Sequence, residues 1–297
     1  MDAPSDSAAD KGISPSAGRA QPHLDIETRF SDLRPGTLDR IVWSTATTGF
    51  LSSRLRKAIR KKLGASRAGP FDIMAEGIRF RAYPTENRCD RVITGQRQLP
   101  ERSERALLAP FVRKGSIFVD IGANVGTYTL WASRLVGPAG RVVALEPHPR
   151  TYAKLRFNIL ANEALNIVVL NVAAGGEEGT ALLRFDGGGN IGGASLLASE
   201  GGASEVSVPI TMRPLKTLIE NAGLPRPDVI KVDIEGFEDQ ALLPYYEMAE
   251  PTLWPVTVMV ETALKERWKT DCVSFLKERG YKEKAATKEN VILQRGG

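Results

Sequence analysis

Short apolar runs alternate with helical stretches from residue 116 onward, and this alternation constrains the fold more than any other feature of the chain. Strands that are joined through helices form parallel sheets with right-handed crossovers. The predicted strands are 117–121, 141–145, 167–172, 229–233, 256–260 and 290–294, and the predicted helices are 127–135, 149–161, 215–221, 238–243 and 265–279. The pattern is typical of the α/β class.

Two further regions depart from this alternation. The Gly-rich stretch 175–202 lies between the alternating segments 181–185 and 206–210, which predicts an inserted β-hairpin with a long connection. Ahead of the alternating core, a hairpin around Gly77 and a helix over 101–112 are expected. The predicted organisation is a disordered tail (1–28), a basic helical extension (29–70), a hairpin and helix leading into the core (71–112) and the α/β domain (113–297).

Positive charge is concentrated in residues 29–70, which carry ten basic and two acidic side chains. A helix is expected over 38–63, with Leu51, Leu55, Ile59 and Leu63 four residues apart. Its basic part, 51–63, allows two interpretations: a solvated helix packed on the core, or a peripheral contact with a membrane surface or another polyanion. Aromatic residues are sparse beside these cations, which argues against nucleic acid.

The sequence also bears on the cellular compartment in which the protein is expected. The sequence contains no run of 18 apolar residues, and residues 1–28 lack the charged-then-apolar order of a signal peptide. Cys89 and Cys272 are far apart and suggest neither a disulfide framework nor a zinc site. We therefore expect a cytoplasmic protein, with peripheral membrane contact left open by the basic segment.

The segment Phe118-Val-Asp-Ile-Gly-Ala-Asn-Val-Gly126 joins the first predicted strand to a helix. Its glycines are four residues apart, so it is not the G-x-G-x-x-G fingerprint of dinucleotide-binding proteins. Asp120 ends the strand at the edge where ligands of open α/β sheets bind, and Glu146 ends the second strand. Acids at these points suit ribose hydroxyls and a cationic group better than a pyrophosphate, which favours S-adenosylmethionine.

Three motifs together resemble the FkbM family of class I methyltransferases. They are Asp120-Ile-Gly-Ala-Asn-Val-Gly126, Glu146-Pro-His-Pro149 and Ile230-Lys-Val-Asp-Ile-Glu-Gly-Phe-Glu238. The resemblance covers about Leu99 to Leu293. It implies a three-layer Rossmann-like sheet, mostly parallel with an antiparallel last strand, and methyl transfer from S-adenosylmethionine, usually to a hydroxyl oxygen of a glycan, lipid or secondary metabolite.

The resemblance also implies the residues of a cofactor site. Glu146 would bind the ribose hydroxyls, and Asp120 would organise the amino-acid end of the cofactor, whose carboxylate would meet backbone N–H groups of the glycine loop. Residues after the third strand would meet the adenine. The expected cofactor-binding residues are Asp120, Gly122, Asn124, Gly126, Glu146, Pro147, Asn171 and Ala173.

An alcohol acceptor needs a general base within hydrogen-bond reach. Asp233, Glu235 and Glu261 follow the fourth and fifth predicted strands and are the candidate catalytic residues. They could also form an oxygen-only metal site, but their spacing does not indicate one. His148 lies between two prolines at a predicted helix start, which favours a structural role over catalysis.

Two other functions remain open at this point. A nicotinamide-dependent oxidoreductase also uses a strand, a glycine loop and a helix, although the missing G-x-G-x-x-G counts against it. A membrane-associated scaffold with a degenerate methyltransferase fold would not need the acids and glycines of the first two motifs, and these are intact.

Overall fold

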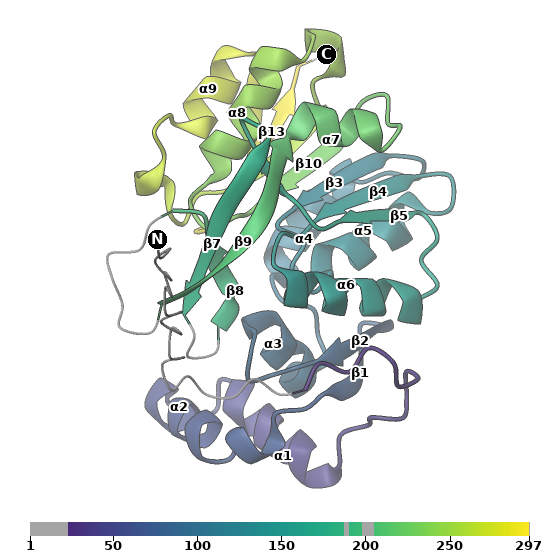
Figure 1. The fold of residues 1–297 in the computed structure, drawn as a ribbon, viewed down its shortest axis with the longest axis vertical. Coiled ribbons are helices and arrows are strands. Elements are labelled where there is room, and N and C mark those ends of the chain that lie inside the picture. The colour runs from purple at the N-terminus through teal and green to yellow at the C-terminus, as the bar shows by residue number, and fades with distance from the viewer. Residues whose placement is uncertain (1–22, 187–189, 198–204, 297) are drawn as a thin grey trace, which may run out of the picture.

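A seven-stranded central sheet forms the core of the computed structural model, which describes residues 23–186, 190–197 and 205–296 (Figure 1). The strand order is β12-β13-β11-β10-β3-β4-β5. β13 is antiparallel to both of its neighbours, and the other pairs are parallel. The strands are β3 (Ile117–Ile121), β4 (Arg141–Leu145), β5 (Ile167–Leu170), β10 (Val229–Val232), β11 (Thr257–Glu261), β12 (Tyr281–Ala286) and β13 (Asn290–Arg295). The predicted fold class is confirmed.

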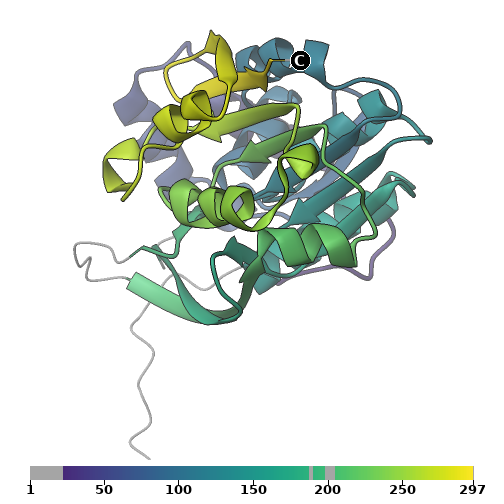
Figure 2. The same ribbon diagram turned by 90° about the horizontal axis from the view of Figure 1, so that it is seen from above.

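Helices cover both faces of this sheet because its strands are apolar on both sides (Figure 2). Phe118 packs toward α5, whereas Val119 and Ile121 pack toward α7, α8 and α9. The helices on the first face are α4 (Arg102–Leu108), α5 (Thr127–Val136) and α6 (Pro149–Ala161), and those on the second are α7 (Leu215–Asn221), α8 (Glu238–Met248) and α9 (Cys272–Glu278).

The C-terminal part differs from the sequence prediction in two places. The helix expected over 265–279 is a short 3₁₀ turn (Lys265–Arg267) followed by α9, because Asp271 caps the N-terminus of α9 by accepting the N–H groups of Val273 and Ser274. β12, whose residues are mostly exposed and charged, was not predicted. It is an edge strand, where apolar alternation is not required.

The predicted hairpin is present within a larger second sheet. β7 (Gly179–Asp186) pairs antiparallel with β9 (Glu205–Pro214), in a register that sets Ala181 opposite Ile210. β6 (Ala173–Gly175) and β8 (Asn190–Ser195) extend it to the order β6-β9-β7-β8. Residues 187–189 and 198–204 of the expected connection lie outside the described residues.

The N-terminal part contains two helices where one was expected over 38–63. α1 (Thr37–Thr47) and α2 (Ser53–Lys62) are separate because Ser52 accepts the N–H of Leu55 and starts a new helix. The predicted hairpin is present as β1 (Phe71–Ala75) and β2 (Ile78–Ala82). α3 (Arg88–Gln96), which was not predicted, packs against α1 and the hairpin.

The prediction of a disordered tail over 1–28 is wrong for its last residues. The buried guanidinium of Arg81 donates to the backbone carbonyls of Thr28 and Arg29, and the N–H of Asp25 donates to the Tyr83 hydroxyl. These polar contacts order a segment that has little apolar surface to bury. Residues 1–22 lie outside the described residues.

Candidate active site

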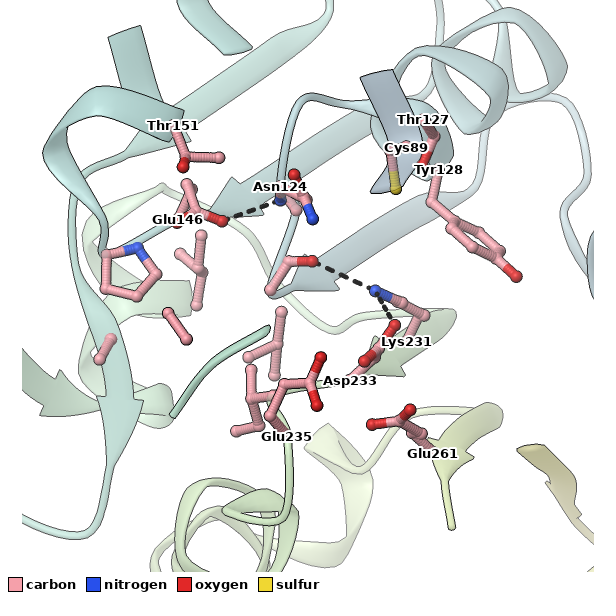
Figure 3. A pocket seen from close by; sticks show the side chains of 18 of the residues that line it. Cys89, Asn124, Thr127, Tyr128, Glu146, Thr151, Lys231, Asp233, Glu235 and Glu261 are labelled. Atoms are coloured by element: carbon pink, nitrogen blue, oxygen red, sulfur yellow. Dashed lines mark hydrogen bonds and ion pairs between the residues drawn. The ribbon is translucent and has the colours of Figure 1, made fainter. Parts of the chain in front are cut away.

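A pocket opens at the carboxyl ends of β3, β4 and β10, where parallel sheets of this kind bind their ligands (Figure 3). The space within it, including its open mouth, is about 1290 Å³. The start of α3, strand β8 and the start of β13 supply its other walls. We call the side near Asn124 and Glu146 the loop end, and the side near Asp233, Glu235 and Glu261 the acidic end.

Glu146 is fixed in place at the loop end. One carboxylate oxygen accepts the N–H of Asn124 at 2.9 Å and the other accepts the N–H of His148 at 2.9 Å. Burial raises the pKa of Glu146 to about 7, although these two N–H bonds act in the opposite direction. Each oxygen keeps a lone pair, so the carboxylate can accept two hydroxyl groups from a ligand.

The glycine loop is built to approach the neighbouring strand closely. Gly122 has φ +80°, and a Cβ there would lie 2.1 Å from the carbonyl oxygen of Asp233. Gly126 has φ +95°, and a Cβ there would lie 2.7 Å from Leu155, so Gly126 serves helix packing and does not line the pocket. Asn124 lines the pocket with φ +52°.

The backbone N–H groups of this loop already have acceptors within the protein. Those of Gly122 and Ala123 both donate to the carbonyl of Leu145, and that of Gly126 donates to the carbonyl of Ala123. The N–H of Val125 donates to the side chain of Asn124. The loop therefore contacts a ligand mainly through its close-fitting backbone and the Asn124 side chain, because these backbone N–H groups already donate within the protein.

Two predicted residues lie behind the pocket wall. Asp120 is fully buried, accepts the Thr129 hydroxyl at 2.6 Å and lies 3.5 Å from the ammonium group of Lys231. Asn171 donates to the backbone carbonyls of Glu146 and Pro147 and so ties two strand ends together. Neither Asp120 nor Asn171 is among the lining residues, whereas Gly122, Asn124, Glu146, Pro147 and Ala173 are.

The three candidate catalytic acids all line the acidic end. Figure 3 shows the side chains of Asp233, Glu235 and Glu261 near one another, with Lys231 beside Asp233. The ammonium group of Lys231 lies 3.2 Å from the Asp233 carboxylate and 3.2 Å from the carbonyl of Gly122. The register that sets Lys231 opposite Asp120 places this single side chain between the acids of two neighbouring strands.

Crowding and burial change the acidity of these groups. Burial, and then the negative charge of Asp233, raise the pKa of Glu261 to about 10 and that of Glu235 to about 7. Burial alone would lower the pKa of Lys231, but the charges of Asp233 and Asp120 raise it above its usual value. At neutral pH Glu261 is therefore protonated, whereas Asp233 faces an ammonium group.

Several lining residues were not predicted from the sequence. Asn87, Arg88, Cys89 and Glu101 come from the segment before the α/β domain. Asn87 caps α3 and its side-chain amide donates to the side chain of Asn124, which connects this segment to the glycine loop. No motif marks these positions, because the contact forms only in the folded chain.

Two polar side chains near the pocket have structural roles, and for His148 this agrees with its place at a predicted helix start. His148 caps α6 by accepting the N–H of Thr151. Glu238 is buried and accepts the N–H groups of Ile234 and Gly236 and the indole N–H of Trp268. Neither side chain lines the pocket.

The profile of the methyltransferase FkbM domain matches residues 120–283, which is more than half of the chain. The chain belongs to the FkbM methyltransferase family. The matched segment extends from the end of β3 into β12. In this FkbM chain the first 119 residues, among them the pocket residues of α3, precede the family domain.

Two curated methyltransferases are similar to this FkbM chain. Methyltransferase sdnD of Sordaria araneosa is 26% identical over 196 residues, covering 55% of this chain and 72% of its own. The hexuronic acid methyltransferase AglP of Haloferax volcanii is 26% identical over 193 residues, covering 64% and 74%. Among solved structures, a methyltransferase from Geobacter sulfurreducens is 12% identical with a TM-score of 0.42, covering 89% of this chain and 100% of its own.

The cofactor of this family and fold is S-adenosylmethionine, and the pocket fits it. A fixed carboxylate with free lone pairs lies at the end of β4, a glycine loop that excludes a Cβ lies beside it, and acids lie where a sulfonium would carry positive charge. In the part of the chain that the structure describes, no group of three His, Cys, Asp or Glu side chains is arranged to hold a metal ion. Within the same residues, no helix is both long and apolar enough to cross a membrane.

Proposed function

We propose that this protein transfers a methyl group from S-adenosylmethionine to a hydroxyl oxygen of a glycan. The observation that carries the proposal is the acidic end of the pocket, where an ion-paired aspartate lies beside two carboxyl groups of raised pKa. Such a site can accept the proton of an alcohol and also hydrogen-bond neighbouring hydroxyl groups.

Each residue has a separate role in the proposal. When bound, S-adenosylmethionine supplies an electrophilic methyl group and a neutral leaving group. Glu146 accepts the ribose hydroxyls. Asp233 accepts the proton of the acceptor hydroxyl, because it lines the pocket 3.2 Å from the ammonium group of Lys231, whereas Glu261 already carries a proton at neutral pH. Glu235 and Glu261 orient the acceptor by hydrogen bonds.

A sugar is the acceptor class that these features support best, ahead of a lipid or a secondary metabolite. The carboxyl groups of Asp233, Glu235, Glu261 and Glu289 line one pocket, and carboxyl oxygens are well suited to bind several hydroxyl groups at once. The similar protein AglP is described as a hexuronic acid methyltransferase, which places sugar methylation within the range of related sequences.

The test is transfer of tritiated methyl from S-adenosylmethionine to a panel of neutral and acidic glycosides, with a long-chain alcohol and a phenol as non-sugar acceptors. We expect label in ether linkage on a glycoside and none on the other acceptors. Label in a methyl ester, or on the non-sugar acceptors alone, would contradict the proposed acceptor. Calorimetric titration with S-adenosylmethionine and with NADH separates the methyltransferase from an oxidoreductase that binds only NADH.

A further inference from the structure

The outer surface of α1 and α2 is both apolar and basic. Of the thirteen large hydrophobic side chains that are exposed in the described residues, five lie within residues 38–63. Phe50, in the connection between the two helices, is 95% exposed. The other four are Leu38, Ile41, Leu55 and Leu63. We call these five side chains, together with the basic side chains of residues 51–63, the docking surface. Exposed apolar side chains that lie close together on a protein often mark a surface that contacts a partner or a membrane.

These side chains are not needed to attach the helices to the rest of the protein. The opposite face of α1 buries Trp43 and Ala46, and the indole N–H of Trp43 donates to the carbonyl of Arg67. α1 approaches α3 so closely that a Cβ at Gly95 would lie 2.4 Å from the carbonyl of Trp43. Ile59 of α2 packs against the same core cluster. Leu38, Ile41 and Phe50 therefore remain available for a partner, as do the exposed parts of Leu55 and Leu63, which flank Ile59 on α2.

The charge of the docking surface has one sign. Residues 51–63 contain six basic and no acidic side chains, and Arg54, Lys57 and Lys62 are exposed. Asp39, the one acid of α1, is paired with Arg67 at 2.6 Å. Exposed aliphatic and aromatic groups beside the exposed cations Arg54, Lys57 and Lys62 match the interface of an anionic bilayer, which offers acyl chains and negative headgroups together.

We propose that the docking surface binds the protein peripherally to anionic lipid bilayers. Phe50 and the exposed leucines enter the interface, and the cations contact the headgroups. Figure 1 shows α1 and α2 together with α3 at one end of the molecule, and α3 contributes Asn87, Arg88 and Cys89 to the pocket. Docking would thus place the pocket one helix layer from the membrane surface.

Co-sedimentation of the full chain with vesicles tests the proposal. We expect binding to phosphatidylglycerol vesicles that weakens with added salt, and little binding to phosphatidylcholine vesicles. Combined Arg54→Gln, Lys57→Gln and Lys62→Gln should lower partitioning about a hundredfold, since each cation near an anionic surface contributes roughly a fivefold factor. Phe50→Ser should lower it roughly tenfold while leaving the charge unchanged.

Matched controls test whether vesicle binding depends on the docking surface and not on the total charge or hydrophobicity of the protein. Combined Arg113→Gln, Lys114→Gln and Lys288→Gln removes three exposed cations elsewhere, and Leu165→Ser removes a side chain that is 94% exposed. Both controls should bind vesicles as the unaltered protein does, and all variants should bind S-adenosylmethionine equally. Equal binding to both lipids, binding to neither, an equal loss in the controls, or a preference for RNA over anionic vesicles would each overturn the proposal.

Discussion

At the loop end of the pocket, the carboxylate of Glu146 receives two backbone N–H groups, whereas at the acidic end Asp233 faces the ammonium group of Lys231, and Glu235 and Glu261 lie near Asp233. The loop end is organised by backbone that the fold fixes whether or not a ligand is present. At the acidic end one oxygen of Glu261 is buried without a hydrogen-bond partner.

The loop end is therefore suited to bind a ligand, whereas the acidic end is suited to exchange a proton with it. The two backbone donors hold the Glu146 carboxylate in position to accept hydroxyl groups, and this recognition requires no proton transfer. At the acidic end, Asp233 lies beside a cation and is placed to accept a proton, whereas Glu261, whose pKa is raised to about 10, can donate a hydrogen bond. Changes at the two ends should therefore have different consequences.

The largest effect is expected from Lys231→Met. This change leaves the buried carboxylate of Asp120 and the carboxylate of Asp233 without their cation, which costs about 3–5 kcal/mol of unfolding free energy. Chemical denaturation measures the loss. Lys277→Met is the matched control, because the pair of Lys277 and Glu283 is exposed and should contribute less than about 1 kcal/mol. A similar loss in both variants would show that Lys231 does not stabilise the fold by pairing with Asp120 and Asp233.

The next effect concerns turnover at the acidic end. Asp233→Asn keeps the shape of the side chain but cannot accept a proton, so kcat should fall by roughly 10² or more while cofactor affinity changes little. Single-turnover methyl transfer and calorimetry measure the two quantities. If Asp233→Asn stays within a factor of about three and Glu261→Gln is inactive, the base lies on β11 instead.

At the loop end, Glu146→Ala should weaken S-adenosylmethionine binding at least tenfold. The change removes the proposed acceptor of two ribose hydroxyls, and hydrogen bonds to a charged acceptor contribute roughly 1.5–3 kcal/mol each. Titration calorimetry gives the dissociation constant, and circular dichroism checks the fold. An unchanged constant in a folded variant would rule out Glu146 as the ribose acceptor.

A smaller change in affinity is expected from Asn87→Ala. Its side chain donates to Asn124, which in turn donates its N–H to Glu146, so the variant loosens the loop end without removing the carboxylate. We expect affinity to fall by a factor of about five, as for the loss of one hydrogen bond of about 1 kcal/mol. An effect on kcat alone would place Asn87 in acceptor binding instead.

The sequence of the α/β domain predicted six of the seven strands of the central sheet, and eight of the eleven site residues predicted from it line the pocket. Strand-end acids and loop glycines are recognisable because local geometry requires them. The wall from Asn87 to Glu101 could not be predicted, since it depends on a contact between α3 and the glycine loop that no local pattern encodes. The break between α1 and α2 was missed because both helices continue the same apolar spacing.

An effect that develops only as the pH rises concerns the stability of the fold. The pKa of Glu261 is raised to about 10 in the folded protein from an ordinary value of 4.5, so between these values the folded state binds more protons than the unfolded state. Stability must therefore fall as pH rises through this window. Glu261→Gln removes this titrating group. The Tm of the variant should exceed that of the unaltered protein, and the difference should grow between pH 6 and pH 9. Each kcal/mol of unfolding free energy regained corresponds to about 2–4 °C. Scanning calorimetry at several pH values measures the difference. Glu283→Gln, at an exposed acid of β12, should show no such trend, and a constant difference across the range would mean that Glu261 ionises normally and could itself act as the base.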